Sequence, residues 1–473
     1  MNKNRAFVKN TIILFVGKFA TQFMSLLLLP LYTHYLLTED YGTVDLLQTY
    51  ISLFIPVLTL RIDSAVFRFL IDKRKNNDGI KKVLSNIFLI LGAGVLFTVL
   101  VAFVLSFFFR IAYFKSVIVN TVVMMISSIM LQILRGLGKN VEYSIASVIT
   151  GAATLISNAI LIIVLNFDAN SILIGSSIAN IICILYVVLN INILKYISFE
   201  EIDKSVLKDI LNYSLPMIPN ALSWWIVNVS DRTIISMFLG VAANGIYTVS
   251  CKFSNILNSI FSIVSMSWQE SATLHINDED RDEYFSNMIN SIFMIFSTIS
   301  LLIISVLPFV YDVIIGSNYM SSYNYVPILL YANSWNVLIG LIGSIYIAKK
   351  RTKEIASTTI VSALINIAIN LVLIKFIGLL AACVSTLLSY MVMSLYRYYD
   401  CQKYVKLKLK FIQIILFSLI YVVSSIIYLN GNMILKIFNL IMVMIFSIII
   451  NKDMIYFLIS IISTKINDFY KNK

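Results

Sequence analysis

The stretch LPMIPNALSWWIVNVSDRTIISMFLGVAANG, Leu215–Gly245, is long and apolar enough to cross a membrane, yet it carries the adjacent pair Asp231 and Arg232. Charge inside a bilayer is costly, so ionisable residues there usually face a protein interior or a water-filled path. We therefore interpret this stretch as a membrane-spanning helix that needs other helices around its polar side.

The composition of the whole chain supports this interpretation. Of its 473 residues, 59% are hydrophobic and only 13% are charged, and the mean hydropathy is +0.89. A soluble protein would have about 25% charged residues. Apolar runs of about 20 residues recur from Thr11 onward, and each is long enough to cross the hydrocarbon. The runs are continuous, whereas barrel strands would alternate, so the spans are helices.

We predict an all-α integral membrane protein with 14 transmembrane helices. Their expected positions are 11–32, 44–70, 84–109, 114–134, 143–165, 171–194, 213–239, 246–268, 286–310, 325–348, 355–375, 378–399, 411–429 and 433–450. The short apolar segment 454–464 is expected to lie at the interface instead.

Basic residues favour one side of the predicted spans. Twenty-seven of the 36 lysines and arginines fall in one set of connecting segments, and only Arg110, Lys115 and Lys375 fall in the opposite set. Short cytoplasmic loops carry such an excess, so both termini are predicted to be cytoplasmic. This alternation explains the net charge of +12 by membrane orientation, and we expect no nucleic-acid partner.

An internal repeat divides the chain. Gly42 aligns with Gly245, and Gly175 aligns with Gly378, each pair 203 residues apart. Both halves would hold six helices in the same orientation, which predicts two bundles around a central cavity. The expected parts are an N-terminal bundle (1–194), a cytoplasmic linker (195–212), a C-terminal bundle (213–400), and two further helices with a tail (401–473). In the linker, Ser198 and Glu201 have the spacing of a capping box that would start an amphipathic helix.

Polar side chains within the spans are the candidate substrate-binding residues. They are Lys18, Gln22, Arg61, Arg68, Arg232 and Lys252. A positive cavity wall suits an anionic substrate, because arginine offers paired donors to phosphate oxygens and lysine offers a mobile charge. Arg68 and Lys18 could instead snorkel to the interface, and Arg61 could belong to a buried structural pair.

Two acids, Asp63 and Asp231, are candidates for coupling transport to a Na⁺ or proton gradient, or for structural ion pairs. Asp231 and Arg232 diverge by about 100° on one helix, so each needs a partner elsewhere, and Lys252 is one candidate for Asp231. No metal site, other cofactor or catalytic grouping is expected, because the sequence has no such motif.

Three segments resemble one known family. They are PLYTHYLLTEDYGTVD (Pro30–Asp45), DSAVFR (Asp63–Arg68), and the run from Tyr213 through Ser230-Asp-Arg to Gly245-Ile-Tyr247. They are similar to Wzx-type oligosaccharide flippases of the multidrug/oligosaccharidyl-lipid/polysaccharide exporter superfamily. The resemblance implies a flippase that moves undecaprenyl-diphosphate-linked oligosaccharide units across a bacterial inner membrane by alternating access. Polysaccharide polymerase and glycosyltransferases would be its protein partners.

Other functions stay open at this point. A lipid II flippase and a multidrug exporter belong to the same superfamily, although the basic residues favour an anionic substrate over an organic cation. A polysaccharide polymerase or ligase would resemble its relatives in carrying a large external loop, and the longest outer loops here hold about a dozen residues. A membrane scaffold for glycosyltransferases would leave the intramembrane charges unexplained.

Overall fold

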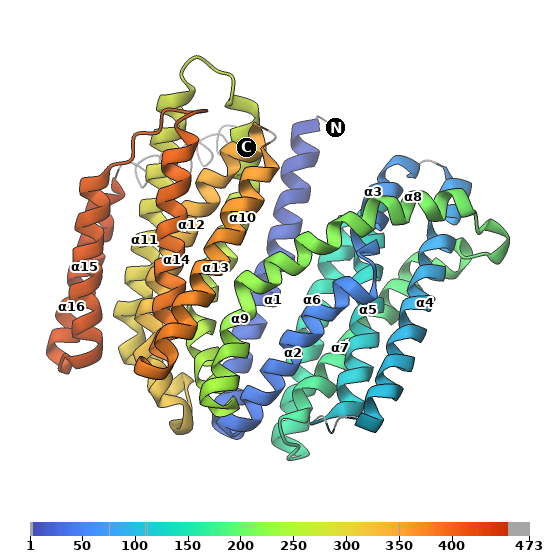
Figure 1. Cartoon of the computed structure of the whole chain (residues 1–473), viewed down its shortest axis with the longest axis horizontal. Helices are drawn as coiled ribbons and strands as arrows, with labels where there is room; N and C mark the ends of the chain where they lie inside the picture. Colours follow the sequence, from blue (N-terminus) through green and yellow to red (C-terminus); the bar gives the residue numbers. More distant parts are fainter. Residues whose placement is uncertain (1–2, 75, 109, 111, 350, 453–473) are drawn as a thin grey trace, which may run out of the picture. The chain divides into compact units, whose positions relative to one another are not determined.

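The computed structural model describes residues 3–452 apart from 75, 109, 111 and 350, and this part of the chain contains helices and no strand. The α-helices are α1 (Lys3–Tyr35), α2 (Thr38–Leu58), α3 (Ile62–Lys73), α4 (Asn77–Phe108), α5 (Phe114–Gly136), α6 (Asn140–Ala159), α7 (Asn170–Ile191), α8 (Lys204–Ser214), α9 (Ile218–Leu239), α10 (Val241–His275), α11 (Arg281–Ile314), α12 (Val326–Ala348), α13 (Thr352–Ile377), α14 (Leu380–Cys401), α15 (Phe411–Asn430) and α16 (Met433–Ile450) (Figure 1). The predicted interfacial segment 454–464 lies outside the described residues.

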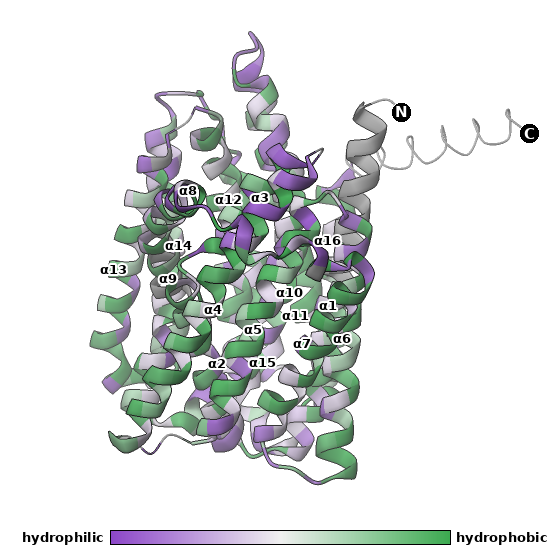
Figure 2. Cartoon of the chain, turned by 90° about the vertical axis from the view of Figure 1, so that its right-hand side faces the viewer, coloured by the Kyte–Doolittle hydropathy of each residue, from purple (hydrophilic) through white to green (hydrophobic). Residues whose placement is uncertain are grey.

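The helices match the predicted spans closely. Within the described residues, eleven helices are long and apolar enough to cross a membrane. Helices α1, α9 and α10 are also long, with 33, 22 and 35 residues, and each coincides with a predicted span. With α2 and α3 counted together, every one of the 14 predicted segments is helical. Figure 2 shows hydrophobic residues along the middle of the helices and hydrophilic residues gathered near their ends.

The chain forms two compact units. The first comprises Met1–Thr248 with Ile315–Tyr319, and the second comprises Val249–Ile314 with Met320–Lys473. Fully buried aliphatic residues of α3, α4, α5 and α7, such as Leu84 and Ile133, form a core in the first unit. The core of the second unit contains more aromatic residues, including Trp268, Phe285 and Tyr346. The first unit also contains α9 and the first turns of α10. The division into bundles at 1–194 and 213–400 stays a prediction.

The predicted helix 44–70 is interrupted, which corrects the sequence interpretation. Leu60 and Arg61 adopt left-handed φ angles of 50° and 56°, between the end of α2 and the start of α3. The Arg61 N–H donates to the Pro56 carbonyl at 3.0 Å, and the Leu60 N–H donates to the Val57 carbonyl at 3.1 Å. This is the bonding pattern of a Schellman motif, which usually has glycine at the left-handed position. Asp63 therefore lies in the first turn of a separate helix, α3, and not in the helix that contains Asp45.

The linker helix α8 begins later than the capping box predicted. Ser198 makes no side-chain cap, and residues Phe199–Glu201 form a short 3-10 turn. The cap of α8 is Asp203, whose carboxylate accepts the Ser205 N–H at 2.8 Å. Hydrogen bonds from the Ser205 hydroxyl and backbone lower the pKa of Asp203. Helix α8 therefore begins directly after Asp203, because the Asp203 carboxylate accepts a hydrogen bond from an N–H group of the first turn that has no partner within the helix.

Candidate functional site

Two glycines related by the repeat bring α2 and α10 into backbone contact within the first unit. A Cβ at Gly42 would lie 1.9 Å from the Val241 carbonyl oxygen, and a Cβ at Gly245 would lie 2.2 Å from the Thr38 carbonyl oxygen. Thr38 and Val241 are themselves 203 residues apart, as are the two glycines. The two helices therefore meet through equivalent surfaces, and neither glycine can carry a side chain without separating them.

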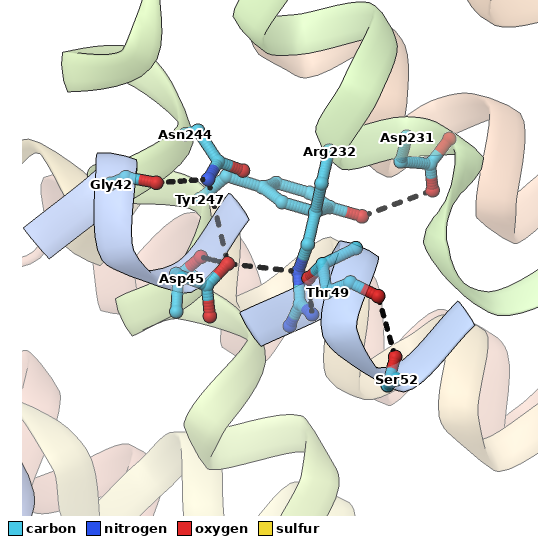
Figure 3. A network of polar contacts seen from close by, with 9 residues as sticks. Gly42, Asp45, Thr49, Ser52, Asp231, Arg232, Asn244 and Tyr247 are labelled. Atoms are coloured by element: carbon cyan, nitrogen blue, oxygen red, sulfur yellow. Dashed lines mark hydrogen bonds and ion pairs between the residues drawn. The ribbon is translucent and has the colours of Figure 1, made fainter. Parts of the chain in front are cut away.

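An ion pair lies one turn from this contact. The Arg232 Nε on α9 is 3.3 Å from the Asp45 Oδ2 on α2, and the Arg232 Nη1 donates to the Thr49 hydroxyl at 3.1 Å. The Asp45 carboxylate also accepts from the Thr248 hydroxyl at 2.8 Å. The side chains of Arg232 and Asp45 are 22% and 11% exposed, so the pair is mostly buried. Figure 3 shows these groups converging between α2, α9 and α10.

Asn244 joins the glycine contact to the ion pair. Its amide nitrogen donates to the Gly42 carbonyl at 2.9 Å and to the Asp45 Oδ2 at 3.4 Å (Figure 3). Both neighbours are acceptors, so they fix the orientation of the amide group. The Asn244 Oδ1 is then buried and has no hydrogen-bond donor among the described residues. Buried acceptors of this kind normally accept a hydrogen bond from a water molecule or a ligand.

Asp231 points to a different partner from its neighbour Arg232, as the helical spacing predicted. The Tyr247 hydroxyl on α10 donates to the Asp231 Oδ2 at 3.1 Å, and Asp231 is only 7% exposed (Figure 3). A tyrosine hydroxyl can donate to a carboxylate without neutralising its charge. The two adjacent charges of α9 thus hold the helix to α2 on one side and to α10 on another.

Arg61 and Asp63 form a local pair at the break between α2 and α3. The Arg61 Nη1 lies 3.3 Å from the Asp63 Oδ2, and the Arg61 Nη2 donates to the Ser64 hydroxyl at 3.0 Å. Both side chains are about a quarter exposed, at 27% and 24%. The Arg61 Nε and the Asp63 Oδ1 are buried without a hydrogen-bond partner in the described part of the chain. The pair therefore keeps one unused donor and one unused acceptor, which a bound group could satisfy.

A model of the family described as "Polysaccharide biosynthesis protein" matches residues 7–269, which is more than half of the chain. The chain belongs to this family. A search of curated proteins found no match. The matched region contains Asp45, Arg232 and Asn244, so the whole network lies within it.

Several solved structures have a fold similar to that of this chain. One is "Lipid II flippase MurJ, inward closed conformation", with 17% identity, a TM-score of 0.68, and coverage of 94% of this chain and 100% of that chain. Another is an inward-facing multidrug resistance MATE family transporter of the MOP superfamily (13% identity, TM-score 0.63, 84% and 93% coverage). A MOP superfamily transporter from Pyrococcus furiosus also matches (14%, 0.59, 84% and 95%). These similarities confirm the predicted fold class, an all-α integral membrane protein of 14 spans.

Arg68 pairs with an acid of its own helix. Its Nη1 is 2.7 Å from the Asp72 Oδ2 one turn further along α3, and the two side chains are 52% and 59% exposed. Asp72 borders a pocket of about 570 Å³ that also includes Lys73, Lys82 and Asp209. An exposed pair near a helix end fits the snorkelling alternative for Arg68.

The remaining predicted residues lie on α1 and α10. Gln22 is half-buried on α1, and Lys252 is half-buried on α10 in the second unit. The side chain of Lys18 lies outside the described part of the structure, as do those of Trp224 and Trp225. Within the described residues, the structure brings Arg232 to Asp45 and Arg61 to Asp63.

Sequence interpretation missed several polar residues. Asn244 and Tyr247 were not predicted as site residues, although the repeat offset of 203 places Thr248 opposite Asp45 and could have identified this turn. Arg397 was not predicted as a buried residue either. The structure places it near the end of α14, 3% exposed, with its guanidinium donating to Thr358, Thr359 and the Ile339 carbonyl. Its donors are used internally, so it stabilises helix packing.

Proposed function

We propose that this protein is a flippase that moves undecaprenyl-diphosphate-linked oligosaccharide repeat units from the inner to the outer leaflet for surface polysaccharide synthesis. The family match supports a role in polysaccharide biosynthesis. The fold, shared with a lipid II flippase and with other transporters, supports translocation as the activity and no covalent step. The proposed location is the cytoplasmic membrane of a bacterium, with both termini in the cytoplasm.

The observation that carries this proposal is the ion pair between Arg232 and Asp45. It joins α2 and α9 through a charged contact in which an anionic ligand could replace the Asp45 carboxylate. Apolar packing between the helices would offer no such exchange. A guanidinium binds phosphate oxygens through paired donors as well as it binds a carboxylate. A diphosphate that takes Arg232 would free the Asp45 carboxylate and loosen the closed contact between α2 and α10. Binding of an anionic lipid and opening would thereby be coupled.

The other charged residues have proposed roles in the same cycle. Arg61, whose Nε has no hydrogen-bond acceptor among the described residues, is the second proposed contact for the diphosphate or for acidic sugars, together with Lys18, Gln22 and Lys252. The exposed pairing of Arg68 with Asp72 favours the snorkelling alternative for Arg68 instead. Asp63 and Asp231 are the proposed acids through which a Na⁺ or proton gradient acts. Their carboxylates already accept hydrogen bonds or pair with a cation, and loss of that partner during opening would change their affinity for an ion.

The test compares replacements of Arg232 and Arg61 with a replacement of Arg68 in the producing organism. Arg232→Ala and Arg61→Ala should abolish surface polysaccharide and cause the undecaprenyl-diphosphate-linked intermediate to accumulate on the inner leaflet. Arg232→Lys should be intermediate, because lysine keeps the charge but not the paired donors. Arg68→Ala is the matched control and should keep most of the export. Normal polysaccharide display by both alanine variants, with protein levels unchanged, would contradict the proposal.

A lipid II flippase is the second candidate, because the highest TM-score among the structures compared above, 0.68, is to such a protein. The two candidates differ in the sugar carried on the same diphosphate lipid, so the intramembrane cations suit both. Complementation decides between them. Expression of this protein should not restore growth to a strain depleted of its lipid II flippase, whereas it should restore surface polysaccharide to a strain that lacks its oligosaccharide flippase.

A further inference from the structure

The segment VKLKLK, Val405–Lys410, has a regular two-sided pattern between α14 and α15. It is not helical, and its residues alternate strictly between buried and exposed. Val405, Leu407 and Leu409 are 1%, 3% and 8% exposed and pack into the core of the second unit. The lysines between them are all exposed. Side chains of an extended chain point alternately to opposite faces, so the three lysines form one row.

The backbone of this row is held by α11. Three acceptors recur at every fourth residue on one face of α11, about 6 Å apart along the helix axis. Alternate N–H groups of an extended chain are about 6.8 Å apart, which is nearly the same interval. The Oδ1 of Asp282, the hydroxyl of Ser286 and the Oδ1 of Asn290 accept the N–H groups of Lys406, Lys408 and Lys410, at 3.1, 2.9 and 2.9 Å.

The match of intervals has two consequences. The extended segment runs alongside the first turns of α11, so the lysines follow one another along that helix. In addition, the Asn290 amide nitrogen donates to the Lys408 carbonyl at 2.9 Å, which closes a two-point contact with the backbone. The positions of the three ammonium groups are therefore set by buried contacts rather than by a flexible loop.

The charges of the row are not neutralised within the described part of the chain. No ion pair within 4.0 Å is found for Lys406, Lys408 or Lys410 among the described residues. The nearby Lys403 differs, because its ammonium lies 2.5 Å from the Asp400 carboxylate. Asp282 is occupied too, since its Oδ1 accepts the Lys406 N–H and lies 3.6 Å from the Arg281 Nε.

The row ends at the boundary of the hydrocarbon. Helix α15 has 20 residues, which is about 30 Å, the thickness of the hydrocarbon core. Ile412 and Ile415, in its first turns, are 84% and 58% exposed, as lipid-facing residues would be. Lys410 directly precedes this helix, so it lies at the level of the headgroups, with Lys408 and Lys406 successively further out on the predicted cytoplasmic side.

We propose that Lys406, Lys408 and Lys410 form a preorganised binding site for anionic phospholipid headgroups of the cytoplasmic leaflet. Basic residues beside a span are attracted to anionic lipids, and the attraction falls off within a Debye length of the surface. Binding to a preformed row costs little ordering entropy. The geometry also sets an order: Lys410 contributes most, then Lys408, then Lys406.

The test measures phosphatidylglycerol binding to the full-length purified protein by native mass spectrometry, with phosphatidylcholine as the neutral reference. Replacing all three lysines (K406Q, K408Q and K410Q together) should weaken phosphatidylglycerol binding on the order of a hundredfold, about fivefold per lysine. Phosphatidylcholine binding should not change. The triple arginine variant should bind phosphatidylglycerol like the original chain, because the charge and the backbone contacts remain.

Two comparisons make the result specific. The matched control replaces three exposed lysines of the first unit, Lys195, Lys204 and Lys208, with glutamine; an equal loss there would overturn the proposal, since any surface lysine would then serve. Single variants should follow the order K410Q, K408Q, K406Q from largest to smallest. Unchanged phosphatidylglycerol binding by the triple glutamine variant would also overturn it, and a concurrent loss of polysaccharide export would then indicate an acidic protein partner.

Discussion

The linker after α7 and the linker after α14 are held by the same pattern of hydrogen bonds from one asparagine, but the bound segments have opposite charges. Asn86 on α4 pairs with the backbone of Glu201 and Asp203, and Asn290 on α11, 204 residues later, pairs with the backbone of Lys408 and Lys410. In each case the amide nitrogen donates to one carbonyl and the amide oxygen accepts an N–H two residues further along. The clamped segment is acidic in the first unit (SFEEID) and basic in the second (KLKLK).

The contact between α2 and α10 also combines an equivalent backbone contact with a difference in charge. Gly42 and Gly245 make equivalent backbone contacts, whereas the next turn has Asp45 in one helix and Thr248 at the corresponding position of the other. A backbone contact has few chemical solutions, because only glycine fits so close an approach, and a side-chain amide offers a donor and an acceptor on two separate atoms. Charge has no such constraint. The two halves of the repeat therefore share these backbone contacts, whereas the charges beside the contacts differ.

The largest effect is expected where the two halves are most alike. Gly42→Ala and Gly245→Ala should each destabilise the protein by about 3 kcal/mol, because the new Cβ would overlap a backbone oxygen and force α2 and α10 apart. Surface polysaccharide should fall in both. The free energy of unfolding in detergent, measured by chemical denaturation, checks the prediction.

Gly92→Ala is the control for this pair, since a Cβ at Gly92 in α4 meets no atom within 4 Å. It should leave stability unchanged or raise it by up to about 1 kcal/mol through helix propensity. A large effect of Gly42→Ala with none of Gly245→Ala would show that the contact is not equivalent from the two sides.

A medium effect is expected at the two asparagines, and here the halves should differ. Asn290→Ala should cost about 2 kcal/mol and Asn86→Ala about 1 kcal/mol, because each leaves buried backbone groups unpaired. The second contact has the shorter bonds, 2.9 Å and 2.9 Å, against 3.4 Å and 3.3 Å in the first. The same denaturation measurement applies, with the exposed Asn190→Ala as the control. Equal losses at both positions would mean that bond length does not rank these contacts.

Sequence patterns predicted the helices well because hydrophobic length is a strong signal in a membrane protein. The break at Leu60 and Arg61 was not predictable in the same way, since neither residue is a glycine and the helical pattern of apolar residues continues through it. The start of α8 was misplaced because Ser198 and Asp203 both have capping side chains, and only the docking of Ser198 against Ser85 decides between them.

The candidate site was predictable in its residue types more than in its partners. The charge of Arg232 within a span signals a polar site from sequence alone. Its pairing with Asp45, 187 positions away along the chain, depends on the approach of α2 and α9. The repeated glycines Gly42 and Gly245 are not sufficient to predict that approach. Asn244 carries no charge and lies in a polar turn, so nothing in its own neighbourhood marks it as the residue that joins the contact to the ion pair.

The smallest effect is expected from moving the carboxylate of the ion pair to the other half of the repeat. The Asp45 Oδ2 is 3.3 Å from the Arg232 Nε and 2.8 Å from the Thr248 hydroxyl, so a carboxylate at position 248 would occupy nearly the same place. Asp45→Thr should cost about 1 kcal/mol by leaving Arg232 partly unpaired, and Thr248→Asp should cost a similar amount by setting two carboxylates together. The double variant D45T/T248D should recover about half of either loss. A double-mutant cycle in unfolding free energy isolates that coupling. Strict additivity of the two losses would show that Arg232 is held by the position of α2 and not by a carboxylate that either half can supply.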